Sequence, residues 1–442
     1  MNLTRTKPYT RNNSKSLGIL LASFVSSGFL AHAQSDSTNK LEQENQELRK
    51  RLDKLEDLLQ KEGITPNKNA ADPPVAAMSA VTISGFVTSS YFYDIASTKD
   101  AHPVGYLWNT ALNQFTLNSV KLTLASPAVD KEKWDAAYRV SLMYGQNAKV
   151  DNSTSGTVGY QAIREAYVEL NAPIGTGLDF RAGELISLLN YESGDGGAVN
   201  ANFSQGYQWW YTGNGPAEGV QLGYDFADNI GMTLRLENGL YTGESDTGSK
   251  TFMGNFFWNP DKKTSLTFLG FAGRQDFVPA WYLNGASFIG SRQLTESHNL
   301  TFATEVDYFH FSGFNSALDG VPGGGANHGD FWSVGAWLTA DLTPTVGVAL
   351  RGEFLDDPTG FGTFWNSPSP SSVESGAPGF SSAIYTTGAG QELSEVTLTL
   401  DYKPVASIKI QPEIRWNHST FNGAFAGKSD QVIVGMGASY IF

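Results

Sequence analysis

No group of residues in this chain is spaced for known catalytic or metal-binding chemistry. The six histidines are scattered, and none stands in an HExxH or similar metal-ligand spacing. The Gly-x-Ser-x-Gly and phosphate-loop motifs are missing, and there is no cysteine. We therefore predict no catalytic residue, no metal and no cofactor. A Ser/His or Asp/His hydrolase site on a barrel rim is a minor alternative, because such sites are recognised by geometry rather than by sequence order.

Charged side chains recur instead at alternate positions of short apolar segments. A β-strand points successive side chains to opposite faces, so each segment has one apolar and one charged face. A charged face needs water, and these strands therefore form either the outside of a sandwich or the inside of a wide pore. The candidate pore-lining residues are Arg139, Arg181, Arg235, Glu237, Arg351, Glu353, Lys409, Glu413 and Arg415.

The connections between these segments alternate in length. Short turns such as 171–177 and 403–406 alternate with long Gly- and Ser-rich stretches such as 188–216 and 357–391. Short turns at one rim and long loops at the other are typical of a bacterial outer-membrane barrel. Strict alternation requires one more strand near 286–294, followed by a turn at 295–299. We predict an all-β fold, a transmembrane antiparallel barrel of 16 strands over residues 81–442, with 14 or 18 strands as alternatives.

The third long loop, 188–216, is both acidic and aromatic. Two interpretations stay open. The loop folds into the barrel lumen, where its acids would face arginines such as Arg139, Arg181 and Arg235, or its aromatic residues belong to the outer interfacial girdle. The inward-loop candidates are Glu192, Asp195, Trp209, Trp210 and Tyr211.

The first 33 residues are typical of a secretory signal peptide. A basic start precedes an apolar run, which ends in the cleavage-like sequence Ala31-His32-Ala33. Its removal takes away four positive charges and no acids, so the formal net charge becomes −14 − 4 = −18. This charge argues against nucleic acid as a partner. No later stretch reaches the roughly 18 consecutive apolar residues of a membrane helix, so a spanning chain must use strands.

Residues 34–62 carry a heptad pattern that predicts a coiled-coil helix in the periplasm. A lone helix of this length is marginal in water, so we expect a homo-oligomer, with a trimer preferred and a dimer possible. A helix lying on the rim of the barrel is the alternative. Residues 63–80 are a Pro-containing linker. The seam positions are Leu41, Asn45, Leu48, Leu52, Leu55 and Leu59.

The last stretch, 430–442, alternates large apolar with mostly small residues. An apolar strand at the end of a soluble sheet would leave an edge that invites aggregation, whereas a closed barrel has no edge. We predict that this strand closes the barrel by pairing antiparallel with the first strand, 81–91.

Two segments resemble the β-barrel porins of the OmpL-like type. The run Arg164-Glu-Ala-Tyr-Val-Glu-Leu-Asn-Ala-Pro-Ile-Gly-Thr-Gly-Leu-Asp-Phe-Arg-Ala-Gly-Glu184 is similar to the core of that family, and 218–239 is similar to its next hairpin. The family pattern usually has Lys where this chain has Glu184. The resemblance implies a channel in the outer membrane of a Gram-negative bacterium, surrounded by outer-membrane lipid. Its solutes would be small and hydrophilic and would diffuse passively, without catalysis.

The resemblance also implies a role for the C-terminus. Tyr440 and Phe442 match the signal that the barrel-assembly machinery reads in such proteins. Two alternatives to passive diffusion stay open. The first is a substrate-specific channel, for example for carbohydrate, and the second is a structural barrel that tethers the envelope.

Overall fold

A computed structural model describes residues 50, 81–95, 111–152, 160–213, 215–240, 242–245, 247–275, 282–313, 328–360, 362, 390–425 and 427–442. The predicted signal peptide, the linker 63–80 and the seam from Leu41 to Leu59 lie outside these residues, so these three predictions stay predictions.

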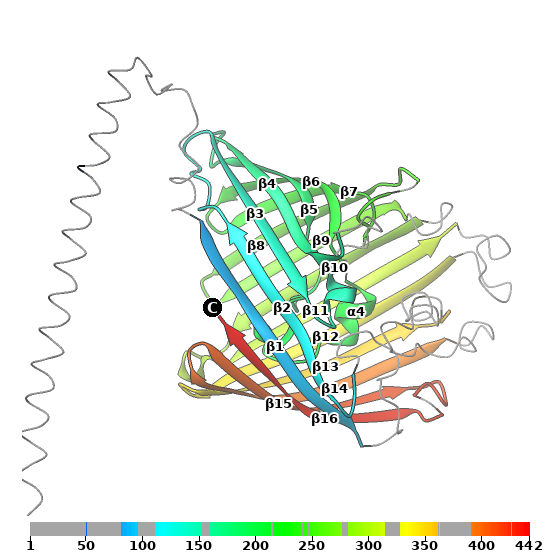
Figure 1. Ribbon diagram of the computed structural model, residues 1–442. Helices are drawn as coiled ribbons and strands as arrows, with labels where there is room; N and C mark the ends of the chain where they lie inside the picture. The colour runs from blue at the N-terminus through cyan, green and yellow to red at the C-terminus, as the bar shows by residue number, and fades with distance from the viewer. Residues whose placement is uncertain are drawn as a thin grey trace, which may run out of the picture. The chain divides into compact units, whose positions relative to one another are not determined.

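Sixteen strands form one closed antiparallel barrel, in which each strand pairs with its neighbours along the chain (Figure 1). This confirms the predicted fold class and strand number. The strands are β1 Thr82–Asp94, β2 Phe115–Ala125, β3 Asp135–Tyr144, β4 Ile163–Ala172, β5 Leu178–Leu185, β6 Ala217–Ala227, β7 Ile230–Glu237, β8 Thr251–Asp261, β9 Thr264–Arg274, β10 Tyr282–Gln293, β11 Thr301–Ser312, β12 His328–Thr343, β13 Val346–Asp357, β14 Gln391–Val405, β15 Ile408–Ser419 and β16 Asp430–Ile441.

The helical segments of the barrel unit are short and lie in its connections. They are α3 Ala148–Asp151, η1 Tyr160–Ala162, η2 Gly196–Ala198, α4 Tyr207–Tyr211 and η3 Ser297–Asn299. Among the described residues, no helix is long and apolar enough to cross a membrane. The strand that loop alternation required is β10, which begins at Tyr282 rather than at Ala286, and the turn after it contains η3.

Burial alternates along the strands as the sequence pattern predicts. On β15, Lys409, Glu413 and Arg415 are buried while Ile414 and Trp416 are exposed. The same alternation of apolar exposed residues with polar buried ones runs around the barrel, which places the apolar face outside. That arrangement suits a lipid environment, because charge on the outer face would be costly near the bilayer midplane.

The barrel closes where β1 meets β16, and the register runs from Phe86 opposite Ile441 to Asp94 opposite Ile433. Beyond the end of β16, the N–H of Gly85 donates to the oxygen of Phe442 at 2.9 Å, and the N–H of Phe442 donates to the Gly85 carbonyl at 3.0 Å. A Cβ at Gly85 would overlap the carbonyl oxygen of Lys121 and lie 2.8 Å from the Phe442 ring, so glycine leaves room both for β2 and for the last side chain. The predicted pairing of the first and last strands is confirmed.

Candidate functional site: the folded-in loop and the inner wall

The connection 186–216, between β5 and β6, crosses the interior of the barrel. Three carboxylates on the inner faces of distant strands accept hydrogen bonds from its backbone N–H groups. Glu305 of β11 accepts from Tyr191 at 2.8 Å. Glu353 of β13 accepts from Tyr207 at 2.5 Å, and Glu413 of β15 accepts from Phe203 at 2.8 Å. Because these acceptors come from three strands, the loop is held along its length, and Figure 1 shows its helix α4 among the strands.

Carboxylates satisfy donors that the loop would otherwise leave unpaired. At the start of α4 the N–H groups of Tyr207 and Gln208 both point to Glu353. The first N–H groups of a helix have no partner within the helix, and a carboxylate acceptor makes a strong bond to them. Gly206 precedes α4, and a Cβ at that position would overlap the Glu353 carboxylate. Glycine therefore allows the carboxylate to approach this closely.

Arg351 of β13 is the most enclosed cation of the loop's docking surface. Its side chain is fully buried, and it donates to Glu192 of the loop at 2.6 Å and to Glu395 of β14 at 2.6 Å. It also donates to the Ser204 carbonyl at 2.6 Å. A buried charge is tolerated only when it is paired and hydrogen-bonded, and Arg351 meets both conditions through the loop.

Two cations of β15 also bind carbonyl oxygens of the loop. Lys409 donates to Gly197 at 3.0 Å, and Arg415 donates to Gln205 at 2.5 Å. Glu353, Glu413, Lys409 and Arg415 therefore share one task, since each bonds to the backbone of this connection.

Two strands from the N-terminal half of the chain, β2 and β4, also hold the loop, through Asp195. Lys121 of β2 lies 2.5 Å from its carboxylate, and Nε of Arg164 of β4 lies 3.6 Å away. Burial alone would raise the pKa of Asp195, but the charges of Lys121 and Arg164 outweigh burial and lower that pKa. Asp195 is therefore ionised at neutral pH and pairs with two cations.

The expected arginines are not the salt-bridge partners of the loop acids. Glu192 pairs with Arg351, and Asp195 pairs with Lys121 and Arg164. The charge of Arg139 still helps to lower the pKa of Asp195. The three expected arginines are paired along the wall itself. Arg139 lies 2.5 Å from Glu165, Arg181 lies 3.3 Å from Glu169 and 3.1 Å from Asp179, and Arg235 lies 3.4 Å from Glu237. Cross-strand register supplies these nearer partners, and sequence spacing does not show them.

The nine candidate pore-lining residues all lie on the inner face, but they differ in access to solvent. The side chains of Arg139 and Arg181 are 38% and 33% exposed. The other seven are buried, at 6% exposure or less. They hold the loop or each other rather than facing open water. Residues that our sequence analysis missed include Lys121, Arg164, Glu305 and Glu395, and the same alternation of polar with apolar positions contains the signal for Glu305 and Glu395.

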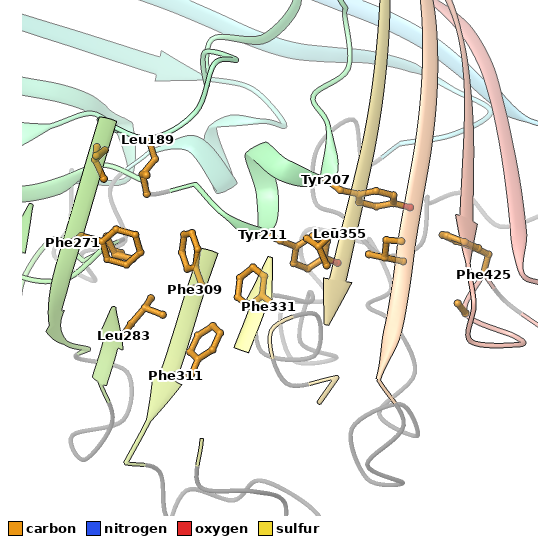
Figure 2. Close-up of a cluster of buried hydrophobic side chains, with 14 of the residues drawn as sticks. Leu189, Tyr207, Tyr211, Phe271, Leu283, Phe309, Phe311, Phe331, Leu355 and Phe425 are labelled. Carbon is orange, nitrogen blue, oxygen red and sulfur yellow. The ribbon is translucent and has the colours of Figure 1, made fainter. Parts of the chain in front are cut away.

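The aromatic residues of the loop lie inside the barrel. Tyr207 and Tyr211 of α4 are buried in a cluster with phenylalanines of β9, β11 and β12 (Figure 2). Trp209 and Trp210 are partly buried and pack against the same cluster. Rings are stacked in part of it, with Phe309 and Phe331 at a centroid distance of 5.0 Å. Of the two interpretations of these aromatics, the structure agrees with the inward one.

A glycine of the final strand makes room for the loop. A Cβ at Gly437 of β16 would overlap the ring of Phe203, so that the ring lies directly on the strand backbone. Phe203 is 2% exposed and stacks on Phe92 of β1 at a centroid distance of 5.7 Å. The loop thus packs against both strands that close the barrel. Within the described residues, no group of three or more His, Asp or Glu side chains could hold a metal ion.

Comparisons with known proteins agree with this architecture. The anion-selective porin of Comamonas acidovorans is 10% identical with a TM-score of 0.52, over 82% of this chain and 99% of that one. OmpT of Vibrio cholerae, an outer membrane protein, is 10% identical with a TM-score of 0.51, over 82% and 97%. At such low sequence identity, these structural similarities show a shared fold and nothing more. No curated protein gives a match. The profile of the family described as "Putative beta-barrel porin-2, OmpL-like" matches residues 80–442, and this chain therefore belongs to that family of outer-membrane porins.

Proposed function

We propose that this protein forms a water-filled channel in the outer membrane, through which small hydrophilic solutes and ions diffuse passively, with no catalytic step. The observation that carries the proposal is a closed 16-strand barrel with a charged inner face, narrowed by a loop that is bonded across it. Barrels of 16 to 18 strands leave an aqueous channel, whereas smaller ones are filled by side chains. Solutes would pass between the folded-in loop and the part of the wall that stays accessible.

The two partly accessible arginines of the inner wall are paired with carboxylates of that wall, of which Glu165 is only 3% exposed. Arg139 lies against Glu165, and Arg181 lies between Glu169 and Asp179. Three carboxylates thus face two guanidinium groups, and the chain as a whole is acidic. A pore lined with more acids than bases favours cations. We propose a modest cation preference.

Reversal potentials across a planar bilayer under a salt gradient test this proposal. We expect a stable single-channel current with cations more permeant than anions. Arg181→Gln should raise the cation preference, because it removes an accessible positive charge. Glu296→Gln, at an exposed turn position, serves as the control and should leave selectivity unchanged. Clear anion selectivity of the wild type would contradict the charge argument, and a barrel without any current would contradict the channel.

We also propose that the coiled-coil segment 34–62 lies in the periplasm and joins three barrels, with a dimer as the alternative. The heptad seam supports this, since one such helix is marginal without partners. The mass of the native particle in detergent should be that of a trimer, and deletion of 34–62 should reduce it. Loss of envelope integrity with unchanged conductance in that deletion would favour the tethering function instead.

A further inference from the structure

A cavity of about 260 Å³ lies where the connection 186–216 meets the region of α3. It is somewhat smaller than the roughly 300–1,000 Å³ of sites for drug-sized ligands, and so suits a smaller solute. The lining combines aromatic with ionisable side chains and includes Asp151, Arg164, Tyr191, Glu192, Trp209 and Trp210.

Asp151 is the unexplained group of this cavity. The residue is only 2% exposed. Neither of its carboxylate oxygens has a hydrogen-bond partner in the described part of the chain. Arg164, the cation next to it, donates to the backbone carbonyl of Asp151 at 2.9 Å and pairs through Nε with Asp195. A buried carboxylate without a donor is costly, so this position is explained best by a ligand that supplies one.

The other acids near the cavity are already engaged. Glu192 is bound to Arg351 at 2.6 Å, and Asp195 is bound to Lys121 at 2.5 Å. Asp151 is therefore the acceptor that the cavity offers to a ligand.

Aromatic rings form part of the apolar lining, beside aliphatic residues such as Leu189. Trp209 and Trp210 are consecutive on α4, with ring centroids 6.2 Å apart. Tyr191 also lines the cavity and packs on Trp337 at a centroid distance of 4.8 Å, which fixes its ring. Indole and phenol faces attract cations, and the attraction is stronger where water is excluded.

We propose that this cavity is a subsite for a small organic cation, whose ammonium or guanidinium group donates to the Asp151 carboxylate while its apolar part contacts Trp209 and Trp210. The inference rests on the proposed function, because the solute would meet the subsite on its way through the channel. Sugar hydroxyls could also donate to Asp151. A full positive charge is the better match, because a bound cation favours the ionised carboxylate over the protonated form that burial favours in its absence. A hydrogen bond between two charged groups is also roughly twice as strong as a neutral one.

Ethylguanidinium and its neutral counterpart ethylurea, which are nearly equal in size, are the probes for this subsite. The full chain in detergent is titrated with each probe and with glucose, and binding is followed by calorimetry and tryptophan fluorescence. Asp151→Asn keeps the size of the side chain and removes its charge. Glu296→Gln, far from the cavity in sequence and exposed, is the matched control.

We expect ethylguanidinium to bind at least about tenfold more tightly than ethylurea or glucose. Asp151→Asn should abolish this difference, and Glu296→Gln should retain it. Equal binding of ethylguanidinium and ethylurea would overturn the proposal, as would a preference for glucose or an unchanged preference in Asp151→Asn. If Asp151→Asn does not fold, the comparison of the probes on the wild type decides.

The same titration separates the subsite from the channel. A barrel that conducts in a bilayer but does not prefer ethylguanidinium contradicts the subsite alone. A barrel that prefers ethylguanidinium but passes no current contradicts the channel alone. Block of the wild-type current by ethylguanidinium, and not by ethylurea, would support both.

Discussion

Asp151 shows how one buried residue couples the loop region to pH. Burial raises the pKa of its carboxyl well above the ordinary 3.8, Asp195 adds to this, and the charges of Arg164 and Lys121 oppose it. The folded protein therefore keeps a proton that the unfolded chain releases. The stabilisation that this carboxyl contributes is fully present below its ordinary pKa. It is lost as the pH rises through the pKa of the folded state, because the folded state binds more protons than the unfolded chain over that range.

Asp151→Asn should consequently raise thermal stability near neutral pH. Asparagine resembles the protonated acid and cannot ionise. The substitution therefore removes the free-energy cost of keeping the buried carboxyl protonated at neutral pH, which is about 1.4 kcal/mol for each unit between its folded and unfolded pKa. Below pH 3.8 the variant and the wild type should unfold at nearly the same temperature. Unfolding in detergent without organic cations, at both pH values, measures this. An equal shift at both pH values would contradict the assigned ionisation.

Sequence spacing predicted the faces of residues better than their partners. Alternation placed Arg351 and Glu353 inside the barrel, because a strand leaves only two directions for a side chain. It could not pair Arg351 with Glu192, which is 159 positions away. That pair depends on the path of a loop, and backbone alternation contains no information about it.

At the scale of elements, the connection 186–216 behaves as part of the wall. It is bonded to β2, β11, β13 and β15, and Phe203 packs on Gly437 of β16. Breaking one buried charge pair of this kind typically costs about 3–5 kcal/mol. The loop should therefore keep one position while solutes pass, and set a constant pore size.

Gly437→Ala should displace the loop. The added Cβ would overlap the Phe203 ring, and overpacking of this kind costs about 1–3 kcal/mol. We expect a larger and noisier single-channel conductance, together with a lower unfolding temperature.

Gly352→Ala on β13 is the matched control for this prediction. A Cβ at Gly352 would meet nothing closer than 3.9 Å, so conductance should stay at the wild-type value. Identical conductance in the two variants would show that Phe203 does not hold the loop in the channel.

The number of elements was predictable, and the position of the third long loop was not. Loop lengths must alternate between the two rims of an up-and-down barrel. This alternation predicted a strand at β10, although the residues of β10 show only a weak strand pattern. The aromatics of 188–216 fit an outer girdle as well as a lumen, because both bury rings. Only the acceptors on distant strands, such as Glu305 and Glu413, distinguish the two.

At the scale of the whole molecule, the barrel depends on a contact between its two ends. β1 and β16 are separated by nearly the whole barrel sequence and pair over nine positions. Such non-local pairing has a high loop-closure cost and forms slowly. The sequence predicted this closure because an apolar strand at the end of the chain would otherwise leave an unpaired sheet edge, and pairing with the first strand removes that edge.

Deletion of Phe442 tests whether the C-terminus is recognised in addition to being packed. The deletion removes two backbone hydrogen bonds to Gly85 and a ring next to Tyr440, at a centroid distance of 6.3 Å. Packing alone predicts a loss of at most the roughly 3–5 kcal/mol of a large core aromatic, since this ring is half exposed on the outer face.

Two measurements on this deletion separate packing from recognition. Refolding into detergent without assembly factors reports packing, and the amount of barrel in the outer membrane of cells reports packing and recognition together. We expect near-normal refolding in detergent but strongly reduced barrel in cells, with Phe442→Tyr, which keeps an aromatic end, near the wild type in both. Normal amounts of the deletion in cells would contradict recognition. Equal losses in both measurements would assign the whole effect to the bonds with Gly85 and the packing of the ring.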